Sequence, residues 1–219
     1  KRKHKFIIRY GEDEQQLWRR FVGMYLIERR WQESDSFKDN FNKDNASLLK
    51  FVFELHKDKM LPDNKKAFEE DTKFYERFME FMRQNNATTM KDGVEIVDLA
   101  KADALLRKDE GIDELINAID KVVGELKGIN EVSALYNNRS LEWRPNYIPF
   151  MRKDKGHDYS DKNMSSIIQR MSAGAQMEAG ATHEWTAQKM YIETDVVKSL
   201  NRYVDEVLRN YYVAPTLRE

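Results

Sequence analysis

Apolar side chains recur every three or four positions along most of the chain, which is the spacing of one face of an α-helix. Five stretches follow this pattern: Glu12 to Trp31, Ser47 to the residues before Leu61, 64–84, 94–129 and 184–212. Polar runs and proline residues separate them. The pattern predicts a mainly α fold, in which several helices pack in a bundle-like arrangement.

Residues 4–10 break this spacing and precede Gly11. Their sequence is His-Lys-Phe-Ile-Ile-Arg-Tyr, which combines β-branched and aromatic side chains. Such side chains favour an extended backbone, so we predict one short N-terminal strand here.

The polar stretch that follows residue 84 indicates a boundary. Residues 84–89 read Gln-Asn-Asn-Ala-Thr-Thr, a composition typical of a linker. We therefore predict an N-terminal region over 1–84, with the strand and the first helices, and a helical C-terminal region over 94–219. The boundary lies near 85–93, and a single domain is the alternative.

Isoleucine, valine and leucine residues of the 94–129 stretch have the spacing of a coiled-coil seam. They step by four, three, four and three residues: Ile112, Ile116, Ile119, Val123 and Leu126. The run spans about two heptads, which favours packing inside the chain over a long coiled coil. A homo-oligomer through residues 112–126 is the alternative, and pairing of strand 4–10 between two copies is another.

An aromatic segment near residues 143–150 contains Pro145 and Pro149, which force an extended backbone on their neighbours. Its aromatic side chains, Trp143, Tyr147 and Phe150, either dock on a partner protein or form a strap across the chain's own core.

Composition narrows the classes of function. The chain has no Cys, so it can form neither a disulfide nor a thiolate zinc site, and it has no cysteine nucleophile. No apolar run is long enough for a membrane span, and the basic start lacks the apolar run of a signal peptide. We expect a cytoplasmic or otherwise intracellular protein. Basic residues outnumber acidic ones in 1–33, and the reverse holds in 94–135.

Asp154, His157, Asp158 and Asp161 place an imidazole and three carboxylates within eight residues, a combination that can bind a divalent metal. The His157-Asp158 pair and the helical content resemble the HD phosphohydrolases, whose metal-binding pair is His-Asp. The resemblance implies a metal-dependent phosphohydrolase. In that family the pair lies in an apolar helix, whereas Lys153, Lys155 and Gly156 precede it here.

The order of elements over residues 4–57 resembles the ribbon-helix-helix family: a basic strand, a helix, a polar loop and a second helix entered through Asn45-Ala46-Ser47. In that family two chains pair their strands into a ribbon that enters the DNA major groove. The resemblance implies that Lys5 and Arg9 read bases and that Asn45 and Ser47 contact phosphate.

The chain has no Gly-rich phosphate loop, nucleophile elbow or calcium-binding loop. We therefore expect a non-enzymatic, mostly helical interaction protein without a cofactor: a subunit, adaptor or scaffold with a protein partner. DNA binding through a ribbon-helix-helix-like dimer is the second hypothesis, and the HD-like phosphohydrolase is the third.

Overall fold

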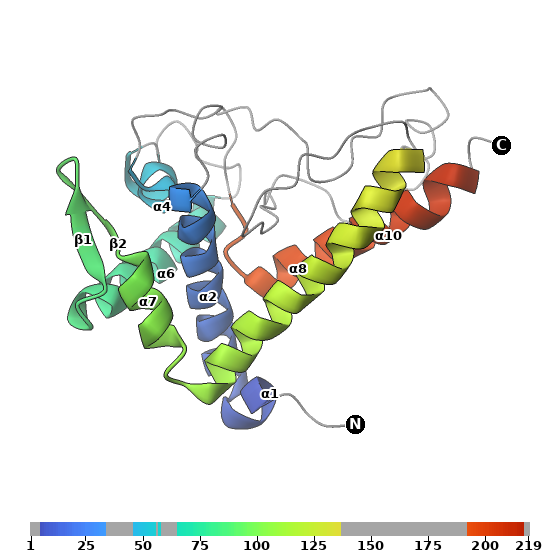
Figure 1. The fold of residues 1–219 in the computed structure, drawn as a ribbon. Helices are drawn as coiled ribbons and strands as arrows, with labels where there is room; N and C mark the ends of the chain where they lie inside the picture. Colours follow the sequence, from blue (N-terminus) through green and yellow to red (C-terminus); the bar gives the residue numbers. More distant parts are fainter. Residues whose placement is uncertain (1–4, 34–45, 56, 58–64, 137–191, 217–219) are drawn as a thin grey trace.

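The computed structural model describes residues 5–33, 46–55, 57, 65–136 and 192–216. These residues form a mainly helical fold with a small antiparallel sheet of two strands (Figure 1). This confirms the predicted fold class. None of the helices in these ranges is both long enough and apolar enough to cross a membrane.

Helix α2 (Glu12–Glu33) runs through the middle of the fold (Figure 1) and contacts α4, α6, α7, α8 and α10. Three acidic residues, Glu12, Asp13 and Glu14, occupy its first turn, where negative charge interacts favourably with the helix dipole. From Arg20 to Trp31 every residue is buried. A helix buried on all sides must pair its polar side chains with other elements, and this requirement shapes the interior of the protein.

Two short helical elements follow α2 after a gap in the described residues: α4 (Leu48–Lys50) and the π-helix η1 (Phe51–Leu55). Helix α6 (Lys65–Gln84) then packs its aromatic side on them and on α2. Phe53 stacks on Tyr75 with ring centroids 5.3 Å apart, and Phe78 meets Phe21 edge to face at 5.5 Å. The helices predicted over 12–31 and 64–84 are thus confirmed, and the aromatic side of α6 is core.

The linker predicted over residues 84–89 runs into a β-hairpin: residues 85–87 form a short connection after α6, and Thr88 begins the first strand. Strands β1 (Thr88–Lys91) and β2 (Val94–Val97) pair antiparallel, with Lys91 opposite Val94. Asp92 and Gly93 form the turn with φ of 51° and 76°, the two positive values that a type I′ turn requires. Asp-Gly is the sequence signal of such a turn, so the hairpin was readable in the sequence.

Helix α7 (Leu99–Leu106) follows the hairpin, and the long helix α8 (Glu110–Tyr136) follows α7. The Asp98 carboxylate caps α7 by accepting a hydrogen bond from the Lys101 backbone N–H at 3.2 Å. The helical stretch predicted over 94–129, as a helical pair or one broken helix, is wrong for 94–97, which form β2. The rest of it forms the two helices α7 and α8.

Helix α10 (Val196–Thr216) lies beside α8, and both run in the same direction away from α2 (Figure 1). We call this pair of helices the α8–α10 arm. The helix predicted over 184–212 is confirmed from Val196 onward, but residues 193–195 are not helical, and Asp195 accepts hydrogen bonds from the Val197 and Lys198 N–H groups. Residues 184–191 lie outside the described residues.

The strand predicted over residues 4–10 is wrong, because Lys5–Arg9 form helix α1. Phe6 is buried against α8, where its Cα lies beside Gly111, and its ring is 5.3 Å from the Tyr10 ring one helical turn later. This packing on α8 outweighs the β propensity of the isoleucines. The strand through which two copies were predicted to pair is therefore absent from residues 5–9.

The buried core is one continuous cluster that includes Phe21 of α2, Met82 of α6, Ile116 of α8 and Tyr203 of α10. It crosses the boundary predicted near residues 85–93, and Ala87, Ile96 and Val97 of the hairpin region are themselves buried. The division into 1–84 and 94–219 stays a prediction, with the continuous core favouring the single-domain alternative.

Candidate functional site

Charged side chains within the buried part of α2 are the main chemical feature of the interior. Arg20, Glu28, Arg29 and Arg30 are each at most 9% exposed. Burying a charge costs free energy unless the charge is paired and hydrogen-bonded. We therefore treat the partners of these side chains as the candidate site.

Two arginines at the N-terminal half of α2 form ion pairs with residues far away in the sequence. Arg20 pairs with Asp71 of α6, and both side chains are buried. Arg19 binds both carboxylate oxygens of Asp195, and its Nε lies 3.1 Å from Asp195 Oδ1. The two pairs fix α2 to α6 and to the start of α10.

The start of α10 also packs directly on the α2 backbone. A Cβ atom on Gly23 would overlap the Thr194 carbonyl oxygen, so only glycine permits this approach. Thr194 and Asp195 are fully buried. The junction thus combines a close backbone contact with the Arg19–Asp195 pair one turn earlier on α2.

Glu28 holds the start of α4 against α2. Its Oε1 accepts hydrogen bonds from Ser47 Oγ and from the Leu49 backbone N–H, each at 2.8 Å. Burial raises the pKa of Glu28 above its ordinary value, and the bonds from Leu49 and Ser47 oppose this rise. The carboxyl group satisfies backbone donors that the start of a helix leaves without partners.

Arg107, between α7 and α8, is the centre of a second polar cluster. Its guanidinium contacts Asp103 at 3.0 Å and Asp113 at 2.6 Å, and Asp120 lies 3.9 Å away. Asp120 also binds Arg29 of α2 at 2.9 Å. This cluster therefore joins α2, α7 and α8.

Tyr25 of α2 extends the cluster by donating a hydrogen bond from its hydroxyl to Asp103 Oδ1 at 2.7 Å. Burial, together with this bond, raises the pKa of Tyr25, so the hydroxyl keeps its proton at neutral pH. Among the residues that the structure describes, no group of three or more His, Cys, Asp and Glu side chains is placed to hold a metal ion.

The residues predicted to contact DNA do not come together. Lys5 Nζ pairs with Glu110 at 3.4 Å, and Arg9 pairs with Asp109 at 3.2 Å, so both basic side chains face acids of α8 or of the turn before it. Ser47 is buried, caps α4 and donates to Glu28. Helices α1 and α4 lie at opposite ends of α2 (Figure 1). Asn45 lies outside the described residues.

Several other candidate residues also lie outside the described residues. They are the aromatic residues Trp143, Tyr147 and Phe150 and the cluster of Asp154, His157, Asp158 and Asp161. Partner contact and metal binding by these residues stay predictions.

The seam predicted over residues 112–126 packs inside the chain. Its five apolar side chains are between 0% and 6% exposed. The seam thus packs within one chain, as the first of the two predictions proposed. Self-association through the same side chains would require them to leave the core.

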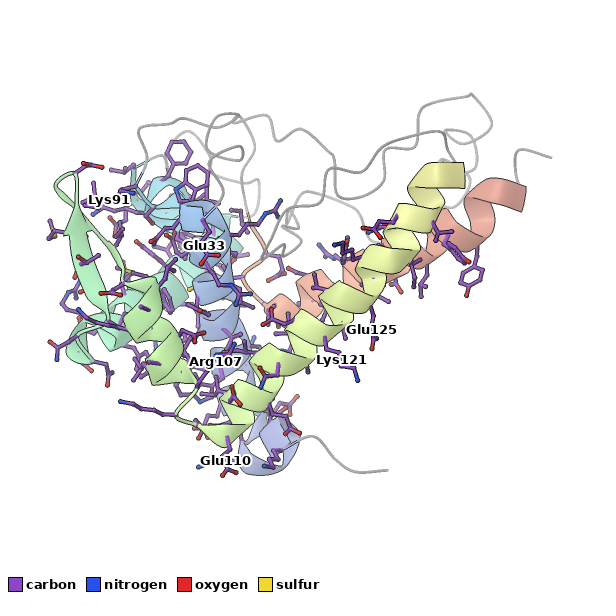
Figure 2. All side chains as sticks on the ribbon, in the orientation of Figure 1. Glu33, Lys91, Arg107, Glu110, Lys121 and Glu125 are labelled. Atoms are coloured by element: carbon purple, nitrogen blue, oxygen red, sulfur yellow. The ribbon has the colours of Figure 1, made fainter. Side chains whose placement is uncertain are left out.

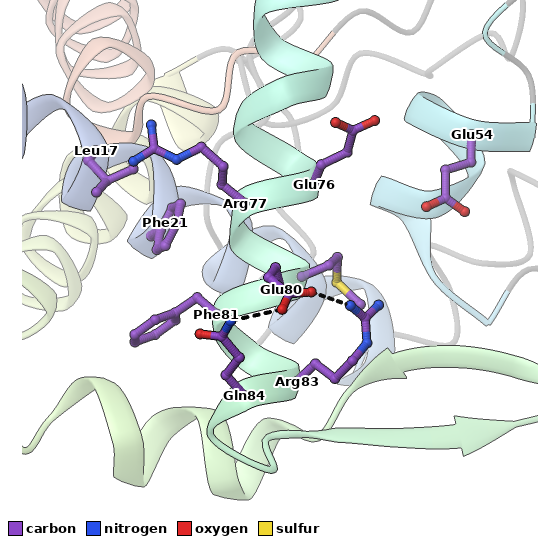
Figure 3. A pocket seen from close by; sticks show the side chains of 10 residues that line it. Leu17, Phe21, Glu54, Glu76, Arg77, Glu80, Phe81, Arg83 and Gln84 are labelled. Carbon is purple, nitrogen blue, oxygen red and sulfur yellow. Dashed lines mark hydrogen bonds and ion pairs between the residues drawn. The ribbon is translucent and has the colours of Figure 1, made fainter.

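A shallow groove of about 660 Å³ lies over the outer side of α6 (Figure 3). Leu17 and Phe21 of α2 line one side and Glu54 of η1 the other, with charged side chains of α6 between them. Arg83 is bound to Glu80 at 2.6 Å and to Glu95 at 2.9 Å. The Arg83 charge in the groove is therefore already paired with neighbouring carboxylates.

The sequence contained a signal for the charged interior, namely Arg19-Arg20 and Glu28-Arg29-Arg30 within an apolar helical repeat. Their partners could not be read from the sequence, because Asp195 lies 176 residues from Arg19.

No protein-family model matches this chain, and neither the curated proteins nor the solved structures give a match.

Proposed function

We propose that the protein is a non-enzymatic, mostly helical interaction protein that acts as a subunit, adaptor or scaffold component. The observation that supports this most strongly is the α8–α10 arm, which extends away from the elements around α2 (Figure 1). The outer part of each helix carries a large exposed apolar side chain: Val132 on α8 is 39% exposed and Tyr212 on α10 is 66% exposed. Tyrosine is enriched in protein interfaces because it has an apolar ring and a polar hydroxyl.

The charged interior supports the same proposal. The paired charges described above link α2 to α6, α8 and α10, and the Tyr25–Asp103 hydrogen bond links it to α7, so their physical role is to fix the helices relative to one another. A rigid base presents the arm in a constant orientation, which reduces the entropy lost on binding a partner.

Site-specific photocrosslinking tests this proposal. A photoreactive phenylalanine derivative replaces Tyr212 in cells that naturally express the protein. We expect a discrete covalent adduct with another protein, because the position lies on the exposed end of α10. The matched control carries the same group at the exposed Lys91 of the hairpin.

The proposal requires that the adduct form at position 212, not form at position 91, and disappear when Val132 is also replaced by Glu. Equal labelling from both positions, or no discrete adduct at position 212, would contradict a binding role for the arm.

A further inference from the structure

Helix α8 has an exposed face opposite the buried seam. Asn117, Lys121, Gly124, Glu125 and Gly128 are all exposed on it. Figure 2 shows Lys121 and Glu125 projecting from α8 on the side away from α10. Among the residues that the structure describes, no atom lies within 4 Å of a Cβ placed on Gly124 or on Gly128.

The packing of the described residues gives no reason for these two glycines. Neither glycine has a positive φ, and neither lies against another described element. Glycine inside a helix destabilises it by roughly 1 kcal/mol relative to alanine. A second helix that approached this face closely would use the space that the missing side chains leave.

The charges on this face are complementary to a second copy of the same face. Lys121 precedes Gly124 and Glu125 follows it, and the two side chains lie one helical turn apart on the same edge. Their own ion pair is long, at 3.9 Å, and both side chains are more than 60% exposed. Two such helices in antiparallel orientation, crossing near Gly124, place each Lys121 opposite the Glu125 of the other copy.

The other edge of the face carries the charges in the reverse order. Asp120, which binds Arg29 and lies 3.9 Å from Arg107, precedes Gly124, and Lys127, which pairs with Glu131 at 3.8 Å, follows it. An antiparallel two-fold pair again brings opposite charges together on this edge. A parallel pair in register would place like charges opposite one another, so the charges select the antiparallel orientation.

We infer that α8 is a homodimerisation helix, which pairs antiparallel with α8 of a second copy through the face centred on Gly124. This interface leaves the seam of residues 112–126 in the core. It also leaves Val132 and Tyr212 outside the centre of the contact. The inference names a second copy as one partner of the proposed interaction protein and rests on that role. Val132 lies on the same side of α8 as Lys121 and Glu125, whereas the photocrosslinking probe at position 212 lies on α10.

Charge reversal tests the inference by sedimentation equilibrium over a series of protein concentrations. Wild type is expected to approach twice the monomer mass of 26.0 kDa as concentration rises, and moderate salt is expected to weaken the dimer. Lys121→Glu alone and Glu125→Lys alone each place like charges opposite one another, which should weaken dimerisation about tenfold. The double variant Lys121→Glu/Glu125→Lys should restore it.

Lys91→Glu on the hairpin is the control and should leave the dimer unchanged. A second test replaces Gly124 by Leu, which has room in the monomer but fills the space between the two helices. We expect this variant to lose the dimer while its melting temperature stays at or above that of wild type at monomeric concentration.

A protein that is monomeric at every concentration overturns the inference, and so does a dimer that none of these variants weakens. A monomeric wild type that still forms the adduct at position 212 would remove the homodimer and leave the proposed function intact.

Discussion

At the scale of single residues, the structure depends on residues whose partners are distant in sequence. Gly23 is one example, because its importance comes from the close approach of the Thr194 and Val196 backbone. In the sequence it is an isolated glycine inside an apolar helical repeat, where glycine is expected only to weaken the helix. The spacing of apolar residues describes each helix separately, so it cannot predict such contacts between distant segments.

Gly23→Ala should lower the free energy of unfolding by about 1–3 kcal/mol, because the added methyl group forces α10 away from α2. Urea denaturation measures this change. Gly124→Ala is the matched control and should raise the free energy of unfolding by up to about 1 kcal/mol at a concentration where the protein is monomeric. Equal effects of the two substitutions would show that α10 does not pack on Gly23.

Glu28 predicts a specific dependence of stability on pH. Burial raises the pKa of Glu28 above the value of 4.5 that applies when the chain is unfolded. The folded state therefore binds this proton more tightly, and the stability it contributes is fully present below pH 4.5. That contribution is lost as the pH rises from 4.5 through the higher folded pKa.

Urea denaturation of wild type and Glu28→Gln across this pH range measures the effect. Wild type should lose stability relative to the variant as the pH rises, because glutamine keeps an acceptor for Ser47 and Leu49 but does not ionise. Glu76 is exposed, so the stability of wild type relative to Glu76→Gln should not fall in this way as the pH rises. If the difference in free energy of unfolding between wild type and Glu28→Gln stays constant across this pH range, burial does not raise the pKa of Glu28.

At the scale of secondary structure, the long amphipathic helices were predictable and the short elements were not. Helices α2 and α6 carry many periodic apolar positions, so the pattern identifies them. Residues 5–9 are too few for periodicity to distinguish helix from strand, and the contact of Phe6 with α8 decides the outcome. The hairpin was missed because its polar first strand resembles a linker, although Asp92-Gly93 marks the turn.

The packing of the α8–α10 arm depends on a buried hydrogen bond. Asn130 Nδ2 donates to Tyr203 Oη at 2.7 Å, and both residues are fully buried. Tyr203→Phe leaves the amide donor of Asn130 without this acceptor, which should lower the free energy of unfolding by about 1–3 kcal/mol. Chemical denaturation measures the loss.

Tyr212→Phe on the exposed part of α10 is the control and should change stability by less than about 0.5 kcal/mol. The double variant Tyr203→Phe/Asn130→Leu should recover much of the loss, because it removes both polar partners. If Tyr203→Phe is as stable as Tyr212→Phe, the Asn130–Tyr203 hydrogen bond does not stabilise the packing of α8 on α10.

At the scale of the whole molecule, α2 is the central element, which contacts α4, α6, α7, α8 and α10. The sequence predicted helices and their apolar faces, but not which helix would lie in the centre. Burial of consecutive residues from Arg20 to Trp31 indicates a central position, and it is visible only in three dimensions. The residues predicted to contact DNA show the same limit, because α1, which contains Lys5, and α4, which Ser47 caps, lie at opposite ends of α2 (Figure 1).

The central claim is that the elements on both sides of residues 85–93 share one core through α2. Native-state hydrogen exchange at increasing urea tests it most directly, because it gives an opening free energy for each segment. We predict that the most protected amides of α2, α6, α8 and α10 converge on a single global value. Convergence of α8 and α10 on a value clearly below that of α2 and α6 would contradict the claim, because it would show two independently unfolding units.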